Sequence, residues 1–230
     1  GHPNSKWLAE ATYWHALCTF KAGRLDEAEK LYLACLEKQP KSEFADNALY
    51  DLAWIAREKK NTDAATARLQ QLLKDFPASD LVPDVKFRLG EMAQDAKDYA
   101  GAATWYEGIL AGGRTPFDDK VLYKLGWCHD YQNNTDKAAA AFLRLCKDCP
   151  KSDLVDEAHY RAGKLLQKAG QLTEAIREYA AVGAGDFAER ALFQNADELL
   201  WRFVFDASCP AVRFSANGGE LFPLRFKRRR

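Results

Sequence analysis

The residues best suited to chemistry in this 230-residue chain are two cysteines, Cys146 and Cys149, which are separated by two residues. This spacing occurs in redox-active dithiols and in zinc sites. A tetrahedral zinc site takes four ligands, and the chain has no second pair of this kind. The pair also directly precedes Pro150 and lacks the alternating strands and helices that surround a thioredoxin-like motif. We therefore interpret both cysteines as packing residues at the end of a helix.

The other candidate chemical groups do not converge on one place. His2, His15, His129 and His159 lie at sequence positions with no regular relation to one another. A catalytic or metal site needs groups that meet in space. The chain also has no phosphate-binding glycine loop, no HExxH motif and no nucleophile motif. The sequence therefore predicts a protein that is not an enzyme, with no catalytic, cofactor-binding or metal site and no small-molecule substrate.

The elements that carry these residues repeat along the chain. An aromatic residue recurs every 36 or 37 residues, and a serine or threonine lies eight residues before each one. The aromatic series is Tyr13, Tyr50, Phe87, Tyr123 and Tyr160, and the hydroxyl series is Ser5, Ser42, Ser79, Thr115 and Ser152. Two markers with one period indicate a tandem repeat, in which each unit packs on its neighbours and no single central core is needed.

One unit, residues 42–77, shows the plan of each repeat. Ser42 is expected to cap a helix that follows the stop at Pro40. Apolar residues then recur at helical spacing over residues 43–60 and again over 63–75, separated by a turn at residues 60–63. Pro77 ends the second helix. Each unit is therefore predicted to be a helix, a tight turn and a second helix, with Gly23 and Gly170 in left-handed turn positions.

Small and large residues alternate at fixed places in these helix pairs. The first helix carries Ala16, Ala53, Gly90, Gly126 and Gly163, and the second carries Ala28, Ala65, Ala102, Ala138 and Ala175. A large residue follows each of the latter by four positions: Tyr32, Leu69, Tyr106, Phe142 and Tyr179. Such alternation lets two helices interlock. Cys18, Cys128 and Cys35 fit the same pattern as small core residues.

With the prolines Pro40, Pro77 and Pro150, these positions resemble the tetratricopeptide repeat. The resemblance covers residues 5–182 as five helix pairs, with part of a sixth at 186–203, and implies an all-α, right-handed α-solenoid. We expect this array to occupy residues 1–203 and an irregular basic tail to occupy residues 204–230. The tail could be a membrane- or nucleic-acid-contacting segment, a small capping hairpin, or sequence that is not native.

The period exceeds the roughly 34 residues usual for the family. In this it resembles bacterial envelope proteins of the kind of the periplasmic Tol–Pal coordinator and the lipoprotein of the outer-membrane β-barrel assembly machine. Their role is to hold other envelope proteins. The chain shows neither a lipidation cysteine nor a trimerising coiled coil, so only the class carries over. The resemblance favours the periplasm or cell envelope, while scattered cysteines suit a reducing compartment and leave the cytoplasm open.

The resemblance also implies that the first helix of each pair lines a concave groove. The residues at groove positions are Tyr50, Trp54, Arg57, Phe87, Glu91, Tyr123, Trp127, Tyr131, Tyr160 and Lys164. We expect this groove to bind a peptide or helix of a protein partner. The alternative is that the aromatic series packs against the second helix of the preceding repeat. The ninth position of the repeat is occupied by Leu17, Trp54, Glu91, Trp127 and Lys164. Because none of these is asparagine, the carboxylate clamp of chaperone-binding members is not expected.

Composition and termini set further limits. The 33 basic and 33 acidic residues balance, so no global field favours nucleic acid. No apolar run reaches the roughly 18 residues of a membrane span. Met92 is the only methionine, and Pro3 and Ser5 match the repeat, so we expect a fragment of a longer array. The alternative function is a regulatory or sensor module of a larger enzyme or signalling protein, and the sequence leaves the oligomeric state open.

Overall fold

The computed structural model describes residues 6–183 and 185–194, with side chains from residue 10 onward. Over these ranges the chain forms α-helices joined by turns and contains no strand, which confirms the all-α repeat fold. The helices are α1 (Lys6–Lys21), α2 (Leu25–Lys38), α3 (Ala45–Glu58), α4 (Thr62–Asp75), α5 (Val82–Asp95), α6 (Tyr99–Leu110), α7 (Asp118–Tyr131), α8 (Thr135–Asp148), α9 (Val155–Lys168) and α10 (Leu172–Ala181). Residues 186–194 begin a further helix, while the rest of the expected sixth pair and residues 204–230 lie outside the described residues.

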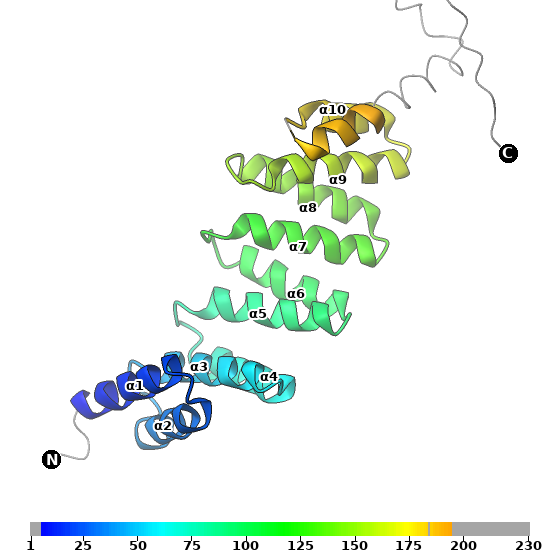
Figure 1. Ribbon diagram of the computed structural model, residues 1–230. Helices are drawn as coiled ribbons and strands as arrows, with labels where there is room; N and C mark the ends of the chain where they lie inside the picture. Colours follow the sequence, from blue (N-terminus) through cyan, green and yellow to red (C-terminus); the bar gives the residue numbers. More distant parts are fainter. Residues whose placement is uncertain (1–5, 184, 195–230) are drawn as a thin grey trace, which may run out of the picture.

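The helices stack in sequence order into an elongated array (Figure 1). Each helix makes its main contacts with the helices just before and after it. Buried apolar residues form four successive clusters along the array. One such cluster joins Tyr32 to Ile55, and another joins Leu69 to Leu89. The helix pairs therefore stabilise one another as neighbours, as in a solenoid, and share no single interior.

The turn inside each helix pair uses one left-handed residue at the same place in the repeat. Gly23 and Gly170 have φ angles of 78° and 77°, as the sequence predicted. The equivalent residues Lys60, Lys97 and Asn133 take φ angles of 59°, 61° and 59°. A left-handed residue ends the first helix and redirects the chain, at a cost that only glycine avoids. The fold therefore imposes this backbone shape whatever the side chain.

The first helices α3, α5, α7 and α9 begin later than the sequence predicted. α3 begins at Ala45, with Phe44 at its cap, so the expected cap at Ser42 is wrong. The hydroxyl of Ser79 instead accepts from the backbone N–H of Leu81 at 3.1 Å and donates to Asp46 Oδ2 at 2.6 Å. These serines therefore shape a turn before the helix and tie it to the preceding repeat.

This serine–aspartate contact recurs where both partners are present. Ser152 Oγ donates to Asp119 Oδ2 at 2.6 Å, across the same 33-residue separation as Ser79 and Asp46. The residue 33 positions before Ser42 is Ala9, and the buried Ser42 hydroxyl has no partner among the described residues. The contact therefore depends on the residue that each repeat carries, and it is not a property of the fold itself.

The predicted interlocking of small and large residues holds the two helices of a pair together. A Cβ atom added at Gly90 would lie 2.6 Å from the Tyr106 ring, and one at Gly126 would lie 2.7 Å from the Phe142 ring. A Cβ atom at Gly163 would meet Tyr179 in the same way, at 2.7 Å. Real Cβ atoms do not approach so closely, so each glycine makes room for one aromatic ring of the second helix.

The left-handed turn generates a stability prediction at Lys97. We expect Lys97→Gly to raise the free energy of unfolding by about 1 kcal/mol, because glycine removes the Cβ clash of the left-handed conformation. Thermal and urea unfolding of the full chain would measure it. The matched control is Ala96→Gly, one residue earlier at an ordinary φ of −76°, which should lower stability. Equal changes of the same sign in both variants would contradict the interpretation.

The helix contact generates a second prediction, for Gly126 and Phe142. Gly126→Ala should destabilise the chain by about 1–3 kcal/mol, because the methyl group collides with the Phe142 ring. Adding Phe142→Leu recreates the Ala53–Leu69 combination of the second pair and should recover part of the loss. Urea unfolding of both single variants and the double variant gives the coupling free energy between residues 126 and 142. If the losses in free energy of unfolding of the two single variants simply add in the double variant, Gly126 does not make room for the Phe142 ring.

Candidate functional site

The predicted groove residues lie on four successive first helices. Tyr50, Trp54 and Arg57 lie on α3, Phe87 and Glu91 on α5, Tyr123, Trp127 and Tyr131 on α7, and Tyr160 and Lys164 on α9. We call the surface formed by these helices the first-helix face. Tyr131 is 57% exposed and Arg57 and Lys164 are exposed, whereas Tyr160 is buried and the other six are half-buried. A partner has partial access to most of the set.

Residues of the aromatic series are engaged in packing, with ring contacts to the second helix of their own pair and to the start of the following pair. Phe87 contacts Tyr106 in the second helix of its own pair, with ring centroids 5.8 Å apart, and Phe117 at the start of the next pair, at 5.5 Å. Tyr160 likewise contacts Tyr179 at 6.1 Å and Phe187 at 5.6 Å. Each ring thus fills the junction between its own pair and the following one.

Three contacts link the ninth position of one repeat to the sixth position of the next. The guanidinium of Arg88 lies 5.1 Å from the centroid of Trp54, and that of Arg161 lies 4.5 Å from the centroid of Trp127. Between them, Lys124 Nζ lies 3.1 Å from Glu91 Oε1. We call these three contacts the groove ladder. They form a continuous line of charged and aromatic surface across four repeats.

Sequence analysis missed the sixth-position residues, Arg88, Lys124 and Arg161. They were not among the expected groove residues, although these three cations follow the same 36- and 37-residue spacing as the aromatic series. A search for charge at a fixed place in the repeat would have found them. Each one directly follows a residue of the aromatic series in the sequence.

The cations of the groove ladder are held in place by carboxylates. Arg88 Nη1 donates to Glu91 Oε2 at 2.8 Å, and Arg161 Nη2 donates to Glu157 Oε1 at 2.9 Å. Burial opposes the charge of Arg88, but hydrogen bonds to Tyr50 and Glu91 outweigh it and raise the guanidinium pKa. Arg88 thus stays charged while one face of its guanidinium covers Trp54. Both tryptophans are therefore fixed in orientation before any partner arrives.

An aromatic strip extends the ladder on α7. Trp127 lies between Tyr123, at a centroid distance of 6.3 Å, and Tyr131, at 5.9 Å. Tyr131 in turn stacks on Tyr99 of α6, with centroids 4.5 Å apart and an interplanar angle of 11°. The strip offers flat apolar faces with polar edges, a combination enriched at protein-binding hot spots.

The second repeat places an acid where the later repeats have cations. Asp51 accepts hydrogen bonds from Tyr32 at 2.7 Å and from Tyr13 at 3.3 Å. Burial raises the pKa of the Asp51 carboxyl, while the two tyrosine hydrogen bonds and the charge of Lys21 act in the opposite direction. Burial and Asp51 also raise the pKa of both tyrosines. This carboxylate joins the first two helix pairs and is largely covered from solvent.

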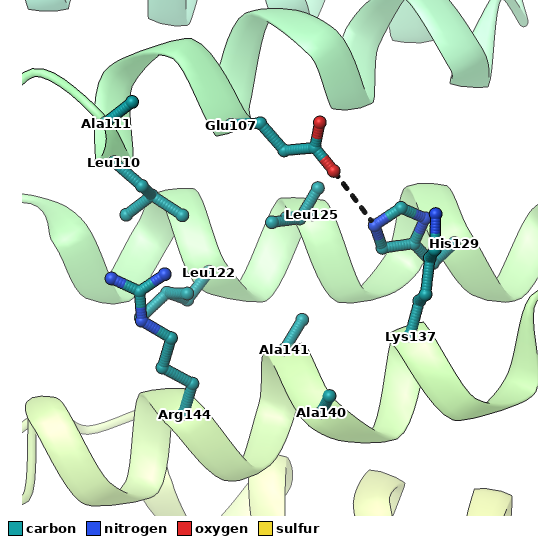
Figure 2. A pocket seen from close by; sticks show the side chains of 10 residues that line it. All are labelled: Glu107, Leu110, Ala111, Leu122, Leu125, His129, Lys137, Ala140, Ala141 and Arg144. Carbon is teal, nitrogen blue, oxygen red and sulfur yellow. Dashed lines mark ion pairs between the residues drawn. The ribbon is translucent and has the colours of Figure 1, made fainter.

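A hollow lies on the other side of α7, between α6 and α8 (Figure 2). Leu122, Leu125 and Ala141 form its floor. At its edge His129 Nε2 lies 3.7 Å from Glu107 Oε1, and burial lowers the pKa of His129. A single histidine–carboxylate pair over an alkyl floor does not assemble the convergent groups that catalysis requires.

The cysteines divide into buried and accessible residues. Cys35 and Cys128 are buried, as predicted for small core residues. Cys18 is exposed, so that prediction is wrong for Cys18. It occupies the same repeat position as Cys128, but it lies in the first described pair, where no earlier described helix covers this face.

No group of three or more histidine, cysteine or acidic side chains within residues 6–183 and 185–194 is arranged to hold a metal ion. None of the described helices is both long enough and apolar enough to span a bilayer.

Family models for the tetratricopeptide repeat match residues 7–78, 50–119 and 120–152. Together these matches cover residues 7–152, from α1 to the end of α8, and the first two overlap at residues 50–78. This chain is a tetratricopeptide repeat protein. Such repeats form protein-interaction modules, and family members are generally non-catalytic scaffolds.

Solved structures show the same fold. MamA residues 41 to the end from Desulfovibrio magneticus RS-1 is 17% identical with a TM-score of 0.57, covering 79% of this chain and 94% of that one. PilF of Pseudomonas aeruginosa is 17% identical with a TM-score of 0.56, covering 87% and 93%. YrrB, described as a tetratricopeptide protein with an unusual peptide-binding site, is 16% identical with a TM-score of 0.57, covering 84% and 89%.

At these identities the likeness shows the fold alone. A comparison with curated proteins gives no match. The narrower resemblance to Tol–Pal and outer-membrane assembly proteins gains no support from these comparisons. The groove residues likewise remain a prediction as binding residues.

The buried Asp51 of this tetratricopeptide array generates a pH-dependent prediction. Because its pKa is raised in the folded state, Asp51 favours folding most below its unfolded pKa, and this contribution is lost as pH rises through the folded pKa. Asp51→Asn keeps an acceptor for a tyrosine hydroxyl but cannot ionise. The free energy of unfolding of the variant minus that of the parent chain should therefore increase from pH 4 to pH 7. Urea unfolding at both pH values measures the difference, and a decrease with rising pH would contradict the assignment.

Proposed function

We propose that this protein is a non-enzymatic scaffold that binds a peptide or helix of a partner protein along its first-helix face. The observation that carries the proposal is the groove ladder, in which two half-exposed tryptophans are held in place by arginines of the next repeat. The tetratricopeptide family and the peptide-binding YrrB structure support a protein-interaction module.

Preorganisation is the physical reason to place binding here. A tryptophan whose ring already packs against a guanidinium loses little side-chain freedom when a partner covers its remaining exposed surface. Trp54 and Trp127 lie two repeats apart, with the Glu91–Lys124 ion pair between them. An extended or helical segment that spans two repeats would therefore meet an apolar anchor at each end and paired charges in the middle. The mixed charges favour a partner with both signs over a uniformly acidic or basic one.

A library of random peptides displayed on phage would test the proposal with the full chain as bait. Selected peptides should bind the parent protein and lose about 2 kcal/mol or more of binding free energy with Trp54→Ala or Trp127→Ala. The matched control is Lys137→Ala, an exposed residue on α8 that borders the hollow away from the groove ladder. Circular dichroism and thermal unfolding would confirm that each variant folds. Unchanged affinity in both folded tryptophan variants would remove the first-helix face from the binding site.

We further propose a bacterial cell envelope as the setting of this scaffold. The support is the long repeat period, in which the chain resembles the envelope type described above. The complete gene discriminates between the two functional candidates. A signal peptide or lipobox would favour the envelope, and an attached kinase, transferase or DNA-binding domain would favour a regulatory module of a larger protein.

A further inference from the structure

Each tryptophan of the groove ladder is followed by a charged residue, and the two charges have opposite sign. Arg57 follows Trp54 by three residues on α3, and Asp130 follows Trp127 by three residues on α7. Residues three apart lie on the same side of a helix, so each charge lies beside its tryptophan on the first-helix face. One repeat position thus carries a cation at one end of the ladder and an anion at the other.

Arg57 is a cation without a carboxylate partner. Its guanidinium lies 4.8 Å from the centroid of Trp54, a ring that Arg88 also contacts, at 5.1 Å. Arg88 is paired with Glu91, which Lys124 shares at 3.1 Å. Arg57 is exposed and forms no ion pair with any acidic residue that the structure describes. Among the groups in contact with Trp54 and Arg88, positive charge therefore exceeds negative charge.

A depression beside Arg57 gives an anionic side chain room to bind. Arg57 and Lys60 line it together with Met92 and Asp95, and its volume is about 430 Å³. Two cations face one carboxylate there, so a second carboxylate from a partner would be attracted. A partner residue in this depression lies next to the exposed part of Trp54.

The other end of the groove ladder has the opposite character. Arg161, whose guanidinium lies 4.5 Å from the centroid of Trp127, is already paired with Glu157 at 2.9 Å. Asp130 is half-buried and has no ion pair to a basic residue within the described part of the chain. A carboxylate without a counter-charge attracts a cation from a partner.

We propose that the partner segment carries an acidic residue at the Trp54 end of the groove ladder and a basic residue at the Trp127 end. This inference rests on the proposed function and adds the direction in which the segment lies. In that direction Arg57 and Asp130 each meet an opposite charge, whereas the reversed direction brings like charges together. Glu58 and Lys164 are also exposed on this face, so charge reversals at single positions, and not the net charge of the face, decide the assignment.

The probes for the test are phage-selected peptides that lose affinity for the full chain with both Trp54→Ala and Trp127→Ala. These peptides should carry an acidic residue toward one end and a basic residue toward the other. Synthetic versions in which the two charges are exchanged should bind the parent chain about tenfold more weakly, because two attractive contacts become repulsive. Fluorescence anisotropy of labelled peptides measures both affinities.

A charge-swapped protein separates recognition from packing. The double variant Arg57→Asp/Asp130→Arg should prefer the exchanged peptides over the original ones, which reverses the order seen with the parent chain. If Arg57 only packed against Trp54, its loss would weaken both kinds of peptide alike. The matched control is Lys74→Asp/Asp75→Arg, at two exposed residues of α4, which should keep the parent preference. Circular dichroism confirms that each variant folds.

The outcomes distinguish this inference from the proposed function. Tryptophan-dependent peptides that lack the two charges, or that bind equally well after the exchange, would overturn the inference and leave the scaffold function standing. A folded double variant that keeps the parent preference would also overturn it. Failure to select any tryptophan-dependent peptide would overturn both.

Discussion

The close approach of two helices within each pair is the constraint on which the rest of this structure depends. At Gly90, Gly126 and Gly163 the first helix leaves no room for even a Cβ atom beside an aromatic ring of the second helix. That contact fixes how far apart the two helices lie and how they are rotated. The rotation in turn decides which first-helix residues point to the following pair and which form the exposed first-helix face.

Contacts between pairs vary, whereas the contact within a pair is nearly constant. At one junction position the residues are leucine with leucine, and at the junction of the fourth and fifth pairs the equivalent residues are Cys146 and His159. In the groove ladder the same geometry accommodates tryptophan with arginine or glutamate with lysine. A solenoid tolerates such exchange because each interface contributes separately to stability. Chemistry that differs from repeat to repeat can therefore be added without changing the fold.

The groove ladder also shows why stability and recognition share residues in this array. Trp54 and Trp127 each contribute to an interface between repeats and still keep part of the side chain exposed. A residue held rigid by its neighbour costs less entropy when a partner covers it. Packing of the aromatic residues is therefore a condition for binding at this face, and the two interpretations drawn from the sequence are compatible.

The sequence by itself determined the repeat, its helix pairs, the left-handed turns at Gly23 and Gly170 and the small–large contacts, because each depends on residues at fixed spacing within one unit. It placed the start of the first helix wrongly at Ser42, because residues 42–44 form a turn before α3 begins at Ala45. Tertiary structure alone decided the Trp54–Arg88 and Trp127–Arg161 stacks. These contacts join different repeats, and the distance between residues of different repeats follows from the stacking of the pairs, which no local pattern encodes.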